Sequence, residues 1–440
     1  MGHNPVIVKI GGLAVDYLRW AERSVTAKPA SADVIGTFDG LRIGAQPSTT
    51  ALQSAPASMP GRLVTVISSD QLRSALASAV PGDVITPLPG RYRLTGSYLK
   101  LDRSGTAAQP IVVRAEEPGT VHFDLEMVEG FWVTSPYWTF ENLNITGVCA
   151  TQGACEHAFH IVGNAHHFVA RNNTIMDFNS HFKINGEDRV WPDDGLLEFN
   201  TIINNSVRQT ANPVDVIDLV GASNWQIRKN FIADFFKGEG NRTSYGGFAK
   251  GAGSHNIFEN NVVICEYRVR DPGAITVGLS LGGGGTGAPY CRDQRCVVEQ
   301  ANGSIRGNLI AACSHEGIYI NHSAQSVLTH NTLIDTAGIT VRFPSSSADV
   351  EGNLVDGLIR TRDGALLRSV DNRDTSAIAL FSGLHLVRDL MDFGAKPLSN
   401  KTLPKRNVSG STAPVPDLCG TSQGAARAYG AFERFAECRR

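Results

Sequence analysis

Seven short segments of the sequence each place one chemically useful side chain on a strand-like pattern. Six of them alternate, so their apolar pairs are expected in a core and the residue between them outside. The expected core pairs are Phe159/Ile161, Phe182/Ile184, Ile217/Leu219, Leu279/Leu281, Ile318/Ile320 and Ile339/Val341. With Lys250 from the segment 248–252, the outward residues are His160, Lys183, Asp218, Lys250, Ser280, Tyr319 and Thr340. If the segments stack as strands about 4.8 Å apart, these side chains form one polar column along a groove.

Such a column has the groups that β-elimination of a uronic acid requires: a cation for the carboxylate, a base for the neighbouring proton and an acid for the leaving oxygen. We expect Lys250 to be the base, because a lysine partly desolvated beside other cations more easily becomes neutral. Tyr319 or Arg342 would donate the proton. The residues assigned to substrate binding are His160, His181, Lys183, Asn185, Asp218, Ser280 and Asn321.

Other interpretations of the column remain open. Lys183, Asp218 and Lys250 on successive coils would also make a stabilising charge ladder. A C5-epimerase shares the first proton abstraction of a lyase. A glycoside hydrolase needs two carboxylates about 5 to 9.5 Å apart, and the column offers only Asp218, with Asp215 at its edge. A carbohydrate-binding or adhesin-like fibre needs no catalysis at all.

The elements that position the column are predicted by a recurring phrase, an asparagine between apolar residues. Gapless alignment of the phrases puts seven asparagines in one register, at positions Asn173, Asn200, Asn230, Asn261, Asn308, Asn331 and Asn353. Neighbouring positions differ by 22 to 31 residues, with one step of 47. Steps of that length fit one coil of three short strands, and the long step marks an insertion at 271–302. Asparagine tolerates the left-handed turn conformation, and its amide can hydrogen-bond to the coils above and below.

The ends of the solenoid also have signatures. A strand is expected at 63–67 and an amphipathic helix at 69–80, which would cap the first coil and cover its open edge. We divide the chain into an N-terminal arm and linker (1–60), a parallel β-helix (61–360), and C-terminal coils with a cap (361–440).

This pattern resembles the right-handed parallel β-helix of pectate lyases, chondroitinase B and alginate lyases. The segments 81–85 and 89–92 look like the opening coil of that superfamily, and 425–433 resembles its closing phrase. The resemblance implies a single-stranded, all-β, right-handed solenoid that cleaves a uronate-containing polysaccharide. In chondroitinase B and alginate lyases an Arg follows the catalytic Lys, which implies Lys250 with Arg270. Those enzymes hold calcium with Asn and Glu, but 241–249 contains no glutamate, so we expect no cofactor, with Ca²⁺ at Asp215 and Asp218 as the alternative.

Composition narrows the partners and the compartment. The net charge of −2 gives no reason to expect nucleic-acid binding, and no apolar run is long enough to span a membrane. The polar column, together with the resemblance to the lyases, implies an acidic polysaccharide as partner. Eight cysteines fall into the pairs Cys149/Cys155, Cys265/Cys313, Cys291/Cys296 and Cys419/Cys438. Disulfides would place the protein in the periplasm or outside the cell, although no signal peptide is visible.

Overall fold

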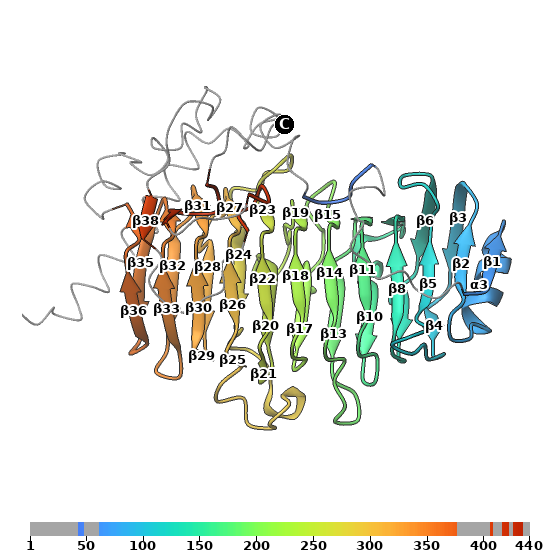
Figure 1. Cartoon of the computed structure of the whole chain (residues 1–440), viewed down its shortest axis with the longest axis horizontal. Coiled ribbons are helices and arrows are strands. Elements are labelled where there is room, and N and C mark those ends of the chain that lie inside the picture. The colour runs from blue at the N-terminus through green and yellow to red at the C-terminus, as the bar shows by residue number, and fades with distance from the viewer. Residues whose placement is uncertain (1–42, 48–60, 376–404, 408–415, 422–425, 434–440) are drawn as a thin grey trace, which may run out of the picture.

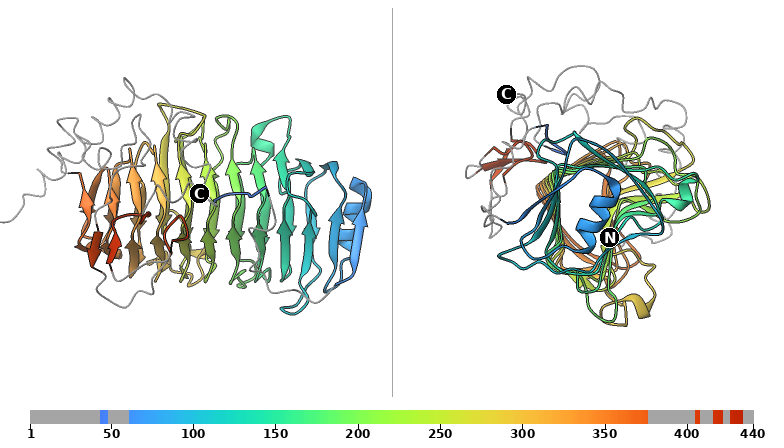
Figure 2. Two further views of the ribbon diagram at one scale, coloured as in Figure 1. Left: turned by 45° about the horizontal axis from the view of Figure 1, so that its top comes forward. Right: turned by 90° about the vertical axis from the view of Figure 1, so that its right-hand side faces the viewer.

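Short parallel strands stack coil upon coil along one axis, and three sheets run the length of the stack (Figure 1). The computed structural model describes residues 43–47, 61–375, 405–407, 416–421 and 426–433. Viewed along the axis, the coils enclose one common core (Figure 2). The predicted all-β solenoid is therefore confirmed.

The strands of each sheet pair in parallel across successive coils. Within the described residues, the first sheet contains β1 (Leu63–Val66), β2 (Val84–Pro87), β5 (Ile111–Arg114), β8 (Trp138–Glu141), β11 (Val169–Arg171), β14 (Leu196–Glu198), β18 (Gln226–Arg228), β22 (Ile257–Glu259), β26 (Ser304–Arg306), β30 (Ser326–Thr329), β33 (Ser347–Glu351) and β36 (Leu366–Val370). The second contains β3 (Gly90–Thr95), β6 (Val121–Glu126), β9 (Asn144–Gly147), β12 (Thr174–Met176), β15 (Thr201–Ile203), β19 (Phe231–Ala233), β23 (Val262–Ile264), β27 (Leu309–Ala311), β31 (Thr332–Ile334), β34 (Leu354–Val355) and β37 (Arg373–Asp374).

The third sheet contains the segments that the sequence analysis assigned to the polar column. It contains β4 (Leu99–Leu101), β7 (Phe131–Val133), β10 (His157–Val162), β13 (Ser180–Asn185), β17 (Ile217–Val220), β20 (Thr243–Lys250), β24 (Ile275–Leu281), β28 (Ile318–Asn321), β32 (Gly338–Arg342) and β35 (Leu358–Arg362), and β16 (Val214–Asp215) pairs with β20. Smaller elements are β21 (Gly253–Ser254), β25 (Gln300–Ala301) and β29 (Ser323–Ala324), the antiparallel pair β38 (Lys405–Asn407) and β39 (Ala426–Ala428), and the 3-10 turns η2 (Gln152–Ala154) and η3 (Ala288–Tyr290).

The asparagine register forms a continuous hydrogen-bond ladder at the corner between the first and second sheets. All seven side chains are fully buried. Each amide nitrogen donates to the amide oxygen of the next ladder asparagine, as Asn230 does to Asn261 at 3.0 Å. The ladder continues one step further, from Asn353 to Asn372 at 2.9 Å.

The left-handed conformation does not belong to these asparagines, contrary to the prediction. It belongs to the residue before each one, such as Phe199 (φ 55°) and Lys229 (φ 55°). The preceding residue turns the corner, which leaves the ladder amide free to point inward and satisfy buried backbone groups.

The interior is filled by the predicted apolar pairs, all of which are completely buried. Beneath the third sheet, Phe131, Phe159 and Phe182 stack from coil to coil with ring centroids 5.2 and 5.3 Å apart. Aromatic stacking of this kind adds to the free energy gained by burial. The stack therefore fixes the strands β7, β10 and β13 on which several candidate site residues lie.

The first coil is covered by α3 (Ser69–Ala77), the capping helix that the sequence predicts. Ser68 is its N-cap and accepts a hydrogen bond from the Gln71 backbone, while Leu72 and Leu76 are buried. The helix ends three residues before the predicted boundary at 80, and Val80 is 47% exposed. At the other end, part of the closing phrase buries Tyr429 and Phe432 in a second apolar cluster.

Three of the predicted disulfides are present, Cys149–Cys155, Cys265–Cys313 and Cys291–Cys296. The fourth pair includes Cys438, which lies outside the described residues. Most of the predicted arm at 1–60 also lies outside them, except 43–47, where the Gly44 backbone donates to the Lys229 carbonyl at 2.9 Å. In the part of the chain that the structure describes, no helix is long and apolar enough to cross a membrane.

Candidate active site

The outer face of the third sheet brings most of the predicted column together, with one shift of register. Strand pairing places Lys183 beside His160 and Asp218 beside Lys183. Asp218, however, pairs with Phe248, and Val220 pairs with Lys250. The observed column is His160, Lys183, Asp218, Phe248, Ser280, Tyr319 and Thr340.

The prediction that Lys250 occupies this column is therefore wrong by two residues. The inward positions of β20 near its end are Gly247 and Ala249, which are too small to produce an apolar alternation in the sequence. Lys250 keeps its outward direction, and its ammonium nitrogen lies 4.2 Å from the centroid of the Phe248 ring. The Lys250 side chain therefore brings its ammonium group back to Phe248, which is in the column, although the Lys250 backbone lies two residues beyond it.

Lys183 and Asp218 form a close ion pair at the centre of this face. Their atoms Nζ and Oδ2 are 2.5 Å apart, and the side chains are 26% and 7% exposed. Burial alone raises the pKa of Asp218, but the charges of Lys183 and Lys250 outweigh burial and hold that pKa below its usual range. Asp218 is therefore an ionised carboxylate held between two lysines.

Asp215 lies three residues before Asp218, and its pKa is shifted in the opposite direction. Burial, followed by the negative charge of Asp218, raises the pKa of Asp215 to about 7. Lys250, Lys183 and Lys237 each lower that pKa and so limit the rise. Two carboxyl groups whose pKa values are pushed apart in this way can divide acid and base roles near neutral pH.

Two residues predicted to bind substrate are closed off from the outer face. His181 is fully buried, and burial followed by the charge of Arg208 lowers its pKa to about 3. Ser280 is also fully buried, with its hydroxyl 2.7 Å from the Gly282 carbonyl oxygen and 2.9 Å from that of Tyr319. For these two the predicted substrate contact is wrong: His181 lies in the row of the buried core residues Ala158 and Val216, and the Ser280 hydroxyl is enclosed by backbone carbonyls.

The two candidate proton donors are paired with each other. Arg342 donates to the Tyr319 hydroxyl at 3.3 Å and forms an ion pair with Asp363 at 2.5 Å. Burial raises the pKa of Tyr319 although the Arg342 hydrogen bond opposes it. Asn321 pairs with Arg342 in register and is 6% exposed.

Arg270 lies away from this face. It is in the turn between β23 and β24, where its Nε is 3.8 Å from Glu266. The spacing to Lys250 therefore does not place Arg270 on a strand of the third sheet.

A tyrosine that the sequence argument missed lies on the strand that carries Lys250. Tyr245 is on β20, pairs with Asp215 in register, and its ring centroid is 5.4 Å from that of Phe248. Burial, then the charge of Asp215, raises the pKa of Tyr245. Its spacing from Phe248 is three residues, which strict alternation would send to opposite faces.

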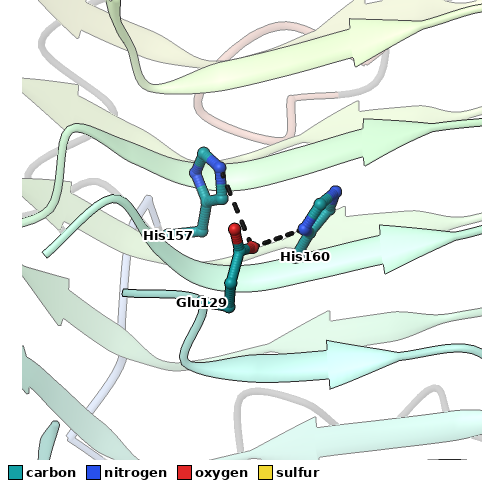
Figure 3. Close-up of side chains that lie close together, drawn as sticks. All are labelled: Glu129, His157 and His160. Carbon is teal, nitrogen blue, oxygen red and sulfur yellow. Dashed lines mark hydrogen bonds and ion pairs between the residues drawn. The ribbon is translucent and has the colours of Figure 1, made fainter. Parts of the chain in front are cut away.

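Glu129, His157 and His160 form a compact group at the edge of the column (Figure 3). His160 Nδ1 lies 2.5 Å from Glu129 Oε2, and His157 Nε2 lies 4.0 Å from the same oxygen. Burial, followed by the charge of His160, lowers the pKa of His157 to about 4. Glu129 and His157 were not predicted, whereas His160 and its partner Asn185 were.

His157 escaped prediction because of a local irregularity. The backbone N–H groups of both Glu156 and His157 donate to the Val128 carbonyl, at 3.2 and 3.0 Å. Between His157 and His160, however, Ala158 and Phe159 are both fully buried, so two successive positions face the core. Strict alternation allows only one such position, and the extra one leaves His157 on the same side as His160, three residues later.

The insertion at 271–302 packs against a neighbouring turn of the same edge. Arg292 forms an ion pair with Asp193 at 2.7 Å and lies 5.1 Å from the Trp191 ring. Glu299 anchors the glycine-rich entry, accepting from the Gly283 backbone at 3.2 Å. These contacts join the two protruding loops beside β13 and β24.

The comparisons with known proteins agree with this architecture. The family model described as "Right handed beta helix region" matches residues 130–355. Among solved structures, pectate lyase Pel9A superposes with a TM-score of 0.54 at 15% identity, covering 86% of this chain and 97% of that one. A rhamnogalacturonan lyase has a TM-score of 0.49 at 15% identity, covering 72% and 87%. An alginate lyase from Paenibacillus sp. str. FPU-7 has a TM-score of 0.38 at 16% identity, covering 71% and 95%.

No curated protein sequence matches the chain. At 15% identity, the likeness to the pectate lyase concerns the fold. The family model spans more than half of the 440 residues. The chain therefore belongs to the right-handed β-helix family.

Proposed function

We propose that the protein cleaves a uronate-containing polysaccharide by β-elimination on the outer face of the third sheet. The observation that carries the proposal is the grouping of Lys183 and Lys250 around the buried carboxyls Asp215 and Asp218. The fold shared with pectate lyase Pel9A supports it. A secreted or periplasmic location follows from the same proposal and suits the three disulfides.

The roles follow from charge and position. Lys250 lies with its ammonium group over the Phe248 ring and forms no ion pair with any residue that the structure describes; it is the base that removes the proton next to the uronate carboxylate. Lys183, whose side chain is 26% exposed, is the group that receives the carboxylate. Tyr245 joins Tyr319 and Arg342 as a candidate donor to the leaving oxygen, since it lies on the same strand as Lys250.

The test is a substrate panel followed by the ultraviolet absorbance of unsaturated uronates. The panel contains alginate, pectate, glucuronan, hyaluronan, chondroitin and dermatan. We expect absorbance to rise with one of them, and Lys250→Met to slow the rise by about 10²- to 10⁴-fold, the usual contribution of a positioned base.

Lys229→Met is the matched control. Lys229 also lies over a phenylalanine, with Nζ 5.1 Å from the Phe199 ring, but at the corner between the first and second sheets. Its removal should leave the rate within about twofold, since it touches no reacting group. Equal losses in both variants, or a flat trace with bound polysaccharide, would reject the lyase and favour a carbohydrate-binding fibre.

A glycoside hydrolase is the second candidate, favoured by the divided pKa values of Asp215 and Asp218. Hydrolysis releases reducing ends without an unsaturated product. In that case Asp215→Asn and Asp218→Asn should each abolish reducing-end release, while Lys250→Met should retain part of it. The two products therefore separate the two candidates in one incubation.

A further inference from the structure

We infer that Glu129, His157 and His160 form a binding site for a divalent metal ion of the zinc class. Their candidate ligand atoms all lie within 4.8 Å of one another on the outer face of the third sheet (Figure 3). Two imidazole nitrogens and one carboxylate oxygen are a donor set that zinc accepts, whereas calcium and magnesium prefer oxygen ligands alone.

The hydrogen bonds of His160 fix which of its nitrogens faces Glu129 as a ligand. The Asn185 amide nitrogen donates to the Gly186 carbonyl at 3.0 Å, so the Asn185 oxygen is the atom turned toward His160. That oxygen lies 2.8 Å from His160 Nε2 and can only accept, so Nε2 carries the hydrogen. In the neutral ring, Nδ1 then presents its lone pair to Glu129.

His157 is oriented by the same logic. Its Nδ1 lies 3.3 Å from the Ser180 backbone carbonyl, which can only accept, so Nδ1 carries the hydrogen. The bare Nε2 faces Glu129. Histidine ligands in metal sites commonly donate their other N–H to a carbonyl or carboxylate, and both rings have such a partner here.

The lone pairs of His160 Nδ1 and His157 Nε2 therefore both face the Glu129 carboxylate, and none of the three groups offers a hydrogen to the others. Lys183, the neighbouring cation, is already paired with Asp218 at 2.5 Å. A metal cation bound between the three groups would accept these electron pairs and remove their mutual repulsion. In a tetrahedral zinc site with bonds of about 2.0 to 2.1 Å, ligand atoms lie about 3.3 Å apart. The present separations of 2.5 and 4.0 Å bracket that value.

The site is open on one side. The side chains of His157, His160 and Glu129 are 15%, 19% and 31% exposed. Three protein ligands with solvent access leave a position for water or for an anionic ligand, as in catalytic rather than structural zinc sites. Because His160 heads the column that contains Lys183 and Asp218, that position faces the proposed polysaccharide surface.

The experiment is calorimetric titration of the full chain with zinc chloride after dialysis against a chelator. The parent carries His166→Ala and His167→Asn, which removes an adjacent, partly exposed histidine pair that would bind metal by itself. We expect one equivalent of tight binding, and visible absorption typical of tetrahedral Co²⁺ when cobalt replaces zinc. Both readouts are independent of any enzymatic activity.

Variants separate a built site from chance binding. Glu129→Gln and His160→Ala should each abolish the one-equivalent binding, and Asn185→Ala, which removes only the orienting partner, should weaken it by about 10- to 100-fold. If His160→Ala does not fold, as judged by circular dichroism, the more exposed Glu129→Gln carries the test.

Binding that is absent in the parent, or that survives Glu129→Gln unchanged, overturns the inference. A proton on His160 Nδ1 would then occupy the gap, and Glu129 and His160 would be an ordinary ion pair. Zinc binding without lyase activity would keep the metal site and reject only the proposed function.

Discussion

The asparagine ladder and the outer face of the third sheet lie on the same coils but follow opposite rules. In the ladder every coil contributes the same residue in the same bond, for example Asn200 to Asn230 at 3.0 Å and Asn230 to Asn261 at 3.0 Å. On the outer face every coil contributes a different residue, and the register slips by two at Lys250. The repeated asparagine bonds hold the coils in register, whereas the candidate site consists of residues that differ from coil to coil.

The two regions also treat polar burial differently. Ladder amides are neutral and find both donors and acceptors within the ladder. Asp218 is a charged group that is almost as deeply buried, and it depends on lysines for compensation. Burying a charge costs far more than burying a bonded amide. The outer face should therefore be the less stable and the more pH-sensitive region.

The largest effect is expected from removing the cation of the central ion pair. Lys183→Met leaves Asp218 buried with part of its compensation lost, and breaking such a pair costs about 3 to 5 kcal/mol of unfolding free energy. Chemical denaturation measures the loss. Adding Asp218→Asn to Lys183→Met should restore most of it, because no charge is then left buried.

An exposed pair is the control for that comparison. Arg93 and Glu126 are 67% and 37% exposed, and Arg93→Met should lower the unfolding free energy far less than Lys183→Met does, because water screens this pair. If Lys183→Met lowers the unfolding free energy no more than Arg93→Met does, the outer face behaves as solvated surface, and its proposed difference from the ladder is wrong.

A break in the middle of the ladder should have the next largest effect. Asn230→Ala removes the acceptor of two Asn200 donors and the donor to the Leu197 carbonyl, leaving buried groups unpaired. We expect a loss of about 2 to 4 kcal/mol in unfolding free energy. The rate of polysaccharide cleavage per folded molecule should stay within about twofold, since the ladder contributes no group to the site.

Asn205→Ala is the matched control, because Asn205 is exposed and bonds only to Asp177 in the described hydrogen bonds. Its cost should stay near or below about 1 kcal/mol. A ladder variant as mild as Asn205→Ala would contradict the view that repeated amides hold the coils in register.

The smallest effect concerns pH. The pKa of Asp215 is raised from 3.8 to about 7 in the folded protein, so the folded state binds its proton more tightly than the unfolded state does. The stability that this contributes is present below pH about 4 and is lost as pH rises through about 7. Relative to the wild type, Asp215→Asn should therefore become progressively more stable as pH rises between those values.

Urea unfolding at a series of pH values measures this difference. Asp218→Asn is the opposing control, because the pKa of Asp218 is lowered and its contribution is lost as pH falls. Parallel stability curves for the wild type and Asp215→Asn would show that Asp215 stays ionised, and would remove it as an acid.

Much of the fold follows from local pattern. The seven asparagines, the apolar pairs from Phe159/Ile161 to Ile339/Val341, and the capping helix were predictable, because each depends on periodicity within one coil. The site was less predictable. The row of Lys250 depends on pairing between β17 and β20, whose inward Gly247 and Ala249 give no apolar signal.

A break in the alternation of the third sheet accounts for the remaining differences. Ala158 and Phe159 on one coil, and Val216 and Ile217 on a later one, are successive residues that are all fully buried in the core. His181 shares the row of Ala158 and Val216 and is buried with them, whereas His157 lies on the outer side. Strict alternation along one strand cannot anticipate two successive inward positions.

The sequence by itself determined the solenoid, the ladder, the apolar pairs and the supply of Lys, His and Asp to one face, because one coil contains the whole pattern. Only the tertiary structure decided that Asp218 stands between Lys183 and Phe248 with Lys250 folded back above it, and that Glu129 meets two histidines. These groupings join residues from different coils, so their geometry depends on a strand register that no single coil encodes.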